Sequence, residues 1–175
     1  TNTRLMNRKL QVIKYLLADI LAAGSAWALF YSYRKLYIEK TVLQFDDRFL
    51  FGVIIIPIFW VLLYAITGAY KNIYRKSRLK ELGQTILISL IGVLIIFFTL
   101  LLDDEVASYK QYYKTFFALF LFHFVLTFIL RFLLTSYAAN KIHNRIIGFN
   151  TLLVGSNHKA YETFMEIENA ERSAG

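Results

Sequence analysis

The stretch Val12–Tyr33, "VIKYLLADILAAGSAWALFYSY", decides the fold of this chain. Nearly all of its residues are apolar, and a helix needs about 20 such residues, each rising 1.5 Å, to cross about 30 Å of hydrocarbon. The run is longer than the apolar part of a secretory signal peptide, and no small-residue cleavage site leads into a water-soluble chain. We therefore expect a transmembrane helix that stays in the protein.

Three further stretches have the same character, and they lie at Phe49–Tyr70, Thr85–Leu102 and Thr115–Tyr137. The whole chain is 57% hydrophobic and 17% aromatic, well above the composition of a water-soluble domain. The sequence thus predicts an all-α membrane protein in which residues 1–140 form a four-transmembrane-helix bundle.

The net charge of +8 is concentrated beside these segments. Basic residues precede the first segment and follow the second and fourth segments, whereas the loop between segments three and four is acidic. The residues concerned are Arg4, Arg8, Lys9, Lys71, Arg75, Lys76, Arg78, Lys80, Lys141 and Arg145 on one side, and Asp103, Asp104 and Glu105 on the other. This alternation follows the positive-inside rule and predicts cytoplasmic N- and C-termini. A nucleic acid partner is not expected, because no basic face carries stacking aromatics outside the membrane segments.

Besides Lys14 near the start of the first segment, two charged residues lie within the apolar segments, Asp19 in the first and Arg131 in the fourth. An acid inside a spanning helix costs about 2.5–3.5 kcal/mol on insertion scales, so it normally faces a partner or water. The two residues lie at similar depths when the helices alternate in direction, which predicts an Asp19–Arg131 ion pair. The alternatives are an Arg131 that extends its head to the interface and a neutral Asp19 bound to a hydroxyl.

Other residues of the segments have structural interpretations. Pro57, the only proline, is expected to kink the second helix because it removes a backbone donor. His123 has no second ligand at helical spacing and is interpreted as a packing residue. Aromatic residues near the predicted membrane surfaces suit interfacial belts, and these are Tyr64, Tyr70, Tyr74, Tyr109, Tyr112 and Tyr113.

After the fourth segment the sequence changes in character. Within residues 141–175, "TLLVG" at Thr151–Gly155 predicts a short buried strand, and a helix follows from Asn157 or His158 to Ala170. A strand, a glycine turn and a helix open a Rossmann-like α/β fold. The turn residues Gly155, Ser156 and Asn157 are weak candidates for binding phosphate, because only the first of three fingerprint glycines is present. The alternative is a turn glycine followed by an N-capped helix.

No catalytic or metal-binding residue is predicted from the residues themselves. The chain has no cysteine, which excludes disulfides, thiolate nucleophiles and cysteine metal sites. We therefore expect no cofactor bound to this chain.

The order of four stretches resembles the N-terminal half of bacterial polyprenyl glycosylphosphotransferases, the large phosphoglycosyl transferases of exopolysaccharide and O-antigen synthesis. They are "NRKLQVIKYLLADILAAGSAWALFYSYRK", "TGAYKNIYRKSRLKELGQT", "LRFLLTSY" and "NTLLVGSNHKA". The resemblance implies a bacterial inner membrane location and four membrane helices before a Rossmann-like domain. A further catalytic domain would use magnesium to move a phosphosugar from a nucleotide diphosphate sugar to undecaprenyl phosphate. That domain is absent from this sequence, so the chain is expected to be a fragment and no catalytic residue is carried over.

Two other functions remain open at this stage. The same membrane helices could precede a nucleotide-sugar 4,6-dehydratase or epimerase. The chain could also be a small membrane scaffold or transporter subunit without enzyme activity. The expected partners are the lipid bilayer and, for the longer transferase, polyprenyl phosphate and a nucleotide sugar; homo-oligomerisation stays open.

Overall fold

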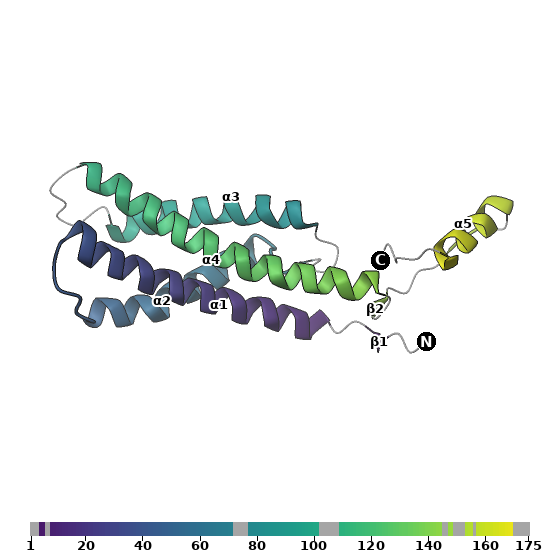
Figure 1. Cartoon of the computed structure of the whole chain (residues 1–175), viewed down its shortest axis with the longest axis horizontal. Coiled ribbons are helices and arrows are strands. Elements are labelled where there is room, and N and C mark those ends of the chain that lie inside the picture. The colour runs from purple at the N-terminus through teal and green to yellow at the C-terminus, as the bar shows by residue number, and fades with distance from the viewer. Residues whose placement is uncertain are drawn as a thin grey trace.

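A computed structural model of the chain describes residues 4–5, 8–71, 77–101, 109–144, 147–148, 153–155 and 157–169. Within them, four helices are long and apolar enough to cross a membrane. The four helices lie side by side in an elongated bundle (Figure 1). The predicted all-α membrane fold with a four-helix bundle is confirmed at this level.

The elements follow one another along the chain with short connections. They are β1 Arg4–Leu5, α1 Arg8–Tyr33, η1 Arg34–Ile38, α2 Asp47–Ile66, α3 Arg78–Ile96, η3 Phe97–Leu101, α4 Tyr109–His143, β2 Ile147–Gly148 and α5 His158–Asn169. The segments η1 and η3 are single π-helical turns that continue α1 and α3.

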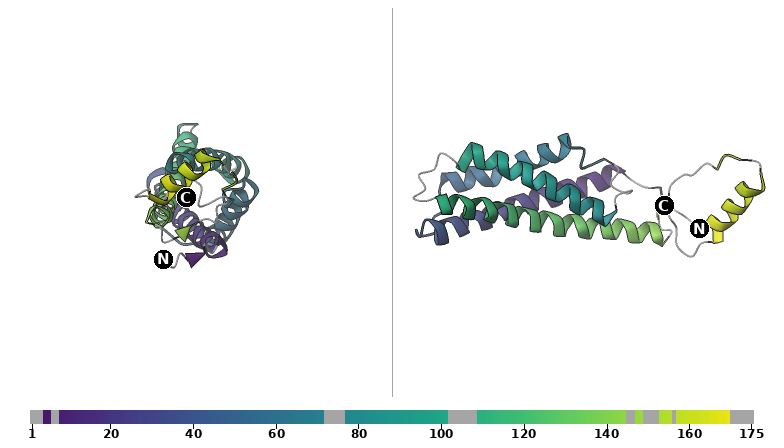
Figure 2. Two further views of the ribbon diagram at one scale, coloured as in Figure 1. Left: turned by 90° about the vertical axis from the view of Figure 1, so that its right-hand side faces the viewer. Right: turned by 90° about the horizontal axis from the view of Figure 1, so that it is seen from above.

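Seen end-on, the four long helices surround a common interior (Figure 2). Helix α1 packs against both α2 and α4, and α3 packs mainly against α4. The start of α1 and the end of α4 lie at the same end of the bundle, which we call the N-terminal end (Figure 1). There β1 and β2 form a two-stranded parallel pair, with Arg4 opposite Ile147.

The helices extend beyond the apolar runs from which they were predicted. Helix α3 begins at Arg78 rather than Thr85, and its N-cap Ser77 accepts a hydrogen bond from the backbone N–H of Lys80 at 3.2 Å. Helix α4 gains polar turns at both ends relative to the predicted 115–137. The reason is that apolar length measures the hydrocarbon crossed, whereas capping residues and charged turns in the headgroup region continue the helix.

Two glycines let tryptophan rings approach neighbouring helices closely. A Cβ atom at Gly92 of α3 would collide with the Trp60 ring of α2, and one at Gly52 of α2 would collide with the Trp27 indole of α1. Large apolar side chains outside the bundle remain exposed, as expected for contact with lipid; examples are Leu21, Phe51, Ile66, Leu87 and Phe117.

Pro57 lies inside α2, and the helix continues on both sides of it. Its side chain is buried and approaches Gly24 of α1, where an added Cβ would lie 3.9 Å from the proline ring. Pro57 therefore packs against α1, and the bend at this position stays a prediction.

In the C-terminal part, the helix predicted from the sequence is present, whereas the predicted strand is not seen among the described residues. Leu153–Gly155 form no strand among the described residues, and the Val154 side chain is 87% exposed, so the expectation of a buried strand there is wrong. An isolated segment cannot form a ladder, because each strand needs a neighbour for its backbone hydrogen bonds. Thr151 and Leu152 lie outside the described residues. Helix α5 starts within the range predicted from the sequence, and it lies beyond the N-terminal end of the bundle (Figure 1).

We predict that Gly92→Ala destabilises the bundle by about 1–3 kcal/mol, because the new methyl group overlaps the Trp60 ring. The matched control is Gly83→Ala in the same helix, where an added Cβ meets nothing within 4 Å. Removing glycine from a helix interior should there stabilise by about 0.5–1 kcal/mol. Thermal unfolding in detergent measures both; equal melting temperatures for the two variants would contradict the proposed packing.

Candidate functional site

The interior of the bundle is lined by polar residues of α4. Buried side chains recur every fourth residue, and those at His123, Thr127, Arg131 and Thr135 are all polar. A spacing of four keeps successive side chains on nearly the same face of a helix. The polar residues of α4 thus form a row that faces the other helices.

Arg131 and Asp19 form the ion pair predicted from the sequence. Arg131 Nε donates to Asp19 Oδ1 at 2.8 Å, and Arg131 Nη2 donates to Asp19 Oδ2 at 2.7 Å. Both side chains are essentially inaccessible to solvent. Two parallel hydrogen bonds between a guanidinium and a carboxylate fix orientation as well as distance, so this pair determines how α1 and α4 are aligned. The alternative of an Arg131 extended to the membrane surface is wrong.

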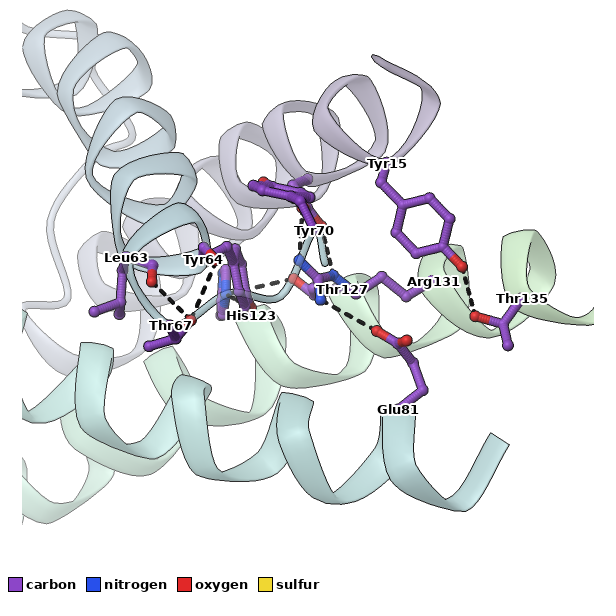
Figure 3. A network of polar contacts seen from close by, with 11 residues as sticks. Tyr15, Leu63, Tyr64, Thr67, Tyr70, Glu81, His123, Thr127, Arg131 and Thr135 are labelled. Carbon is purple, nitrogen blue, oxygen red and sulfur yellow. Dashed lines mark hydrogen bonds and ion pairs between the residues drawn. The ribbon is translucent and has the colours of Figure 1, made fainter. Parts of the chain in front are cut away.

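Glu81 of α3 is the second carboxylate in contact with this guanidinium. Arg131 Nη1 donates to Glu81 Oε1 at 3.1 Å, and the Glu81 side chain is fully buried (Figure 3). The sequence interpretation missed this contact, because Glu81 ends the basic stretch that follows the second segment and lies before the predicted third segment. Its signal was the spacing Glu81, Thr85, Ser89, which places three polar residues on one face of α3.

Two tyrosines complete the surroundings of the arginine. Tyr70 Oη donates to Asp19 Oδ2 at 2.7 Å, and the Tyr64 ring centroid lies 3.9 Å from Arg131 Cζ. A guanidinium over an aromatic face gains about 0.5–2 kcal/mol by cation–π attraction. The interpretation of Tyr64 as an interfacial residue is wrong, since its side chain is fully buried; Tyr74 lies outside the described residues.

His123 belongs to an adjoining cluster about two turns further into the bundle along α4. Its ring stacks on Trp60 with centroids 3.5 Å apart and an angle of 12° between the planes. Tyr64 Oη and His123 Nε2 are 3.1 Å apart, and Thr127 Oγ1 lies 3.4 Å from the same nitrogen (Figure 3). The histidine is buried by tryptophan, tyrosine and threonine, which agrees with its interpretation as a packing residue.

The polar row is closed at the N-terminal end of the bundle by another hydrogen bond between α1 and α4. Tyr15 Oη and Thr135 Oγ1 are 2.6 Å apart, and both residues are buried (Figure 3). Arg131 therefore lies between the Tyr15–Thr135 contact and the Tyr64–His123 contact along the bundle axis.

The chemistry of this arrangement serves to connect helices α1, α3 and α4. Three donor groups of the guanidinium are directed at carboxylate oxygens, and Asp19 also accepts from Tyr70. A nucleophile or base must reach a substrate. Here the carboxylates face an arginine inside the bundle. Removing one member of a buried pair typically costs about 3–5 kcal/mol, because the remaining charge is left unpaired.

We predict that Arg131→Gln and Asp19→Asn each lower the free energy of unfolding by about 3–5 kcal/mol. The double variant should lose less than the two single losses together, because the Asp19–Arg131 interaction is counted in both single losses and is lost only once. Unfolding in detergent by denaturant or heat measures the cycle. Arg78→Gln is the matched control, since Arg78 is exposed and surface charges contribute about 0–1 kcal/mol. Strictly additive losses would contradict the coupling.

At the opposite end of the bundle, α1 and α2 are connected through the residue that caps α2 and not through a buried ion pair. Asp46 precedes α2, and its Oδ1 atom accepts from the backbone N–H of Phe49 at 3.1 Å. Tyr31 Oη of α1 donates to the same atom at 2.7 Å. The hydrogen bond from Tyr31, followed by that from Phe49, lowers the pKa of Asp46 below its ordinary value.

We predict that Asp46 contributes to stability above about pH 4 and that this contribution is lost as the pH falls further. The sign follows because a carboxyl whose pKa is lower in the folded state must be protonated against its hydrogen bonds on acidification. The difference in melting temperature between the unchanged protein and Asp46→Asn should therefore shrink from pH about 6 to pH about 3. A difference independent of pH would show that the asparagine replaces the carboxylate fully.

The predicted phosphate-binding turn is placed only in part. Asn157 Oδ1 accepts from the backbone N–H of Ala160 at 3.0 Å and so caps α5 itself. Ser156 lies outside the described residues, and a Cβ at Gly155 would lie 2.9 Å from the Ala160 side chain. This geometry agrees with the alternative of a turn glycine and an N-capped helix. Among the described residues, no group of three or more His, Asp or Glu side chains is placed to hold a metal ion.

Comparisons with known proteins give no match: no family model, no curated protein and no solved structure is significantly similar to this chain. The site is therefore interpreted from its own geometry.

Proposed function

We propose that this chain is the membrane-anchoring part of a sugar transferase that moves a phosphosugar from a nucleotide diphosphate sugar to undecaprenyl phosphate. The observation that carries the proposal is the sequence of parts: four helices able to span a membrane, followed at the N-terminal end of the bundle by a separate capped helix. The same order of parts underlies the resemblance to polyprenyl glycosylphosphotransferases.

The geometry of the interior supports anchoring rather than catalysis by the bundle itself. The charged residues of the interior, Asp19, Glu81 and Arg131, are bound to one another and tie α1, α3 and α4 together. A rigid bundle of this kind suits a part that holds a catalytic unit at the membrane surface. Magnesium and both substrates would then be bound by the catalytic domain, outside this sequence.

The orientation belongs to the same proposal. The starts of α1 and α3 and helix α5 lie toward one end of the bundle (Figure 1). Arg8 and Lys9 lie at the start of α1 and Arg78 and Lys80 at the start of α3, and the positive-inside rule assigns these basic residues to the cytoplasm. A cytoplasmic position at the bacterial inner membrane is where nucleotide sugars are available.

The proposal is tested by a chimera in which residues 1–144 replace the membrane helices of a characterised polyprenyl glycosylphosphotransferase. We expect membranes containing the chimera to transfer labelled sugar phosphate to undecaprenyl phosphate with magnesium. The chimera should retain at least about a tenth of the parent's rate, which corresponds to an increase of no more than about 1.4 kcal/mol in the activation barrier.

Insertion and orientation are checked on this chain itself, which has no native cysteine. Single cysteines at Lys40 and Asn169, at opposite ends of the molecule, should react from opposite sides of the membrane with an impermeant maleimide. A chimera that is inserted in this orientation, with a folded catalytic domain, and still transfers no sugar phosphate would contradict the proposal.

A further inference from the structure

A cavity of about 350 Å³ opens at the end of the bundle opposite the N-terminal end. It lies between α1, η1 and the first turns of α2, and its lining includes Trp27, Tyr31, Phe51 and Ile55. It is separate from the buried network around Arg131. The proposed anchoring function does not say which ligand would occupy it.

The lining changes from charged to apolar along the helix axes. Arg34 and Lys35 of η1 and Arg48 of α2 line it at the level where the membrane spans end. Trp27 lies two helical turns further in along α1, about 10 Å at 1.5 Å per residue. Ile55 lies about the same distance beyond Arg48 along α2. A ligand that fills this cavity therefore needs a charged head and an apolar body.

The charges at the rim favour an anionic head. Arg34 Nε and Lys35 Nζ both contact the Glu39 carboxylate, at 2.8 and 2.9 Å, so two cations share one acid. Asp46 is bound by Tyr31 and by the start of α2. Together with Arg48, the lining has three cationic and two anionic side chains, and the single excess positive charge matches one phosphodiester.

A polar group at intermediate depth is also suited to a ligand. The Trp27 side chain is only 8% exposed, and its Nε1–H group has no hydrogen-bond acceptor among the described residues. This nitrogen has almost no accessible surface and lies against Gly52, which also lines the cavity, so an acceptor of a ligand reaches it only when the indole shifts. A buried donor without an acceptor costs about 1–3 kcal/mol, which favours such a shift. Glycerophospholipids carry ester carbonyls at this depth, between the phosphate and the acyl chains.

We propose that this cavity binds one anionic glycerophospholipid of the phosphatidylglycerol class. Its phosphodiester contacts Arg48 and Lys35, an ester carbonyl accepts from Trp27 Nε1–H, and one acyl chain lies against Phe51 and Ile55. A zwitterionic phosphatidylethanolamine brings an added ammonium group and leaves the excess positive charge of the rim uncompensated. The site is independent of whether the longer protein is a transferase.

The test is native mass spectrometry of the detergent-purified chain titrated with phosphatidylglycerol, phosphatidylethanolamine or free glycerol 3-phosphate. We expect phosphatidylglycerol to bind with a stoichiometry of one and more tightly than phosphatidylethanolamine. Trp27→Phe keeps the ring and removes the N–H donor, and it should weaken binding about threefold to tenfold. Arg48→Gln should weaken it about fivefold.

The matched control is Lys114→Gln, which removes an exposed positive charge near the same end of the bundle but outside the cavity. Its phosphatidylglycerol affinity should stay unchanged, and circular dichroism should show equal helix content in all variants. Unchanged binding by both Trp27→Phe and Arg48→Gln would overturn the site. Equal affinity for the two phospholipids would overturn the anionic class, and displacement of phosphatidylglycerol by glycerol 3-phosphate would show a phosphate site rather than a lipid site.

Discussion

One guanidinium in an apolar interior constrains the rest of this bundle. Arg131 is fully buried, and leaving it unpaired there would cost several kcal/mol. Its partners come from different parts of the chain: Asp19 from α1, Glu81 from α3, and the ring of Tyr64 from α2. Because each contact has a short distance and a fixed direction, the depth of every helix relative to α4 is restricted. The four helices thus have one alignment in which the charge is satisfied.

The two ends of the bundle are stabilised by different forces. Toward the N-terminal end, polar contacts connect helices that are distant in sequence, such as Tyr15 with Thr135. From the level of His123 onward the interior becomes more apolar and aromatic, with Trp60, Leu119 and Phe30 among its buried residues. Hydrogen bonds and ion pairs in a membrane interior are directional, whereas apolar packing between helices competes with equally apolar lipid. The first half therefore sets the alignment, and close packing at glycines completes the second.

The sequence predicts those features that depend on one segment at a time. Apolar length gave the four spans, and matching depths of Asp19 and Arg131 gave their pair. Glu81 was missed because a charged residue at the start of a segment is indistinguishable from a surface residue until the partner's reach is known. Tyr64 was misplaced for the same reason, since an aromatic near a helix end suits the interface and the interior alike. The strand expected at Thr151–Gly155 depended on neighbouring strands, which local patterns do not supply.

The choice of arginine rather than lysine follows from this geometry. A guanidinium presents a planar fork that contacts both oxygens of Asp19, leaves Nη1 directed at Glu81 and exposes a flat face to Tyr64. An ammonium group could approach the same carboxylates only as a point charge and would lose the parallel pair of hydrogen bonds. Such a site holds helices in place and has little freedom to move. The opposite end has exposed charges, a capping carboxylate and a cavity between α1 and α2 in place of buried ion pairs. This is therefore the end at which we propose that a lipid binds.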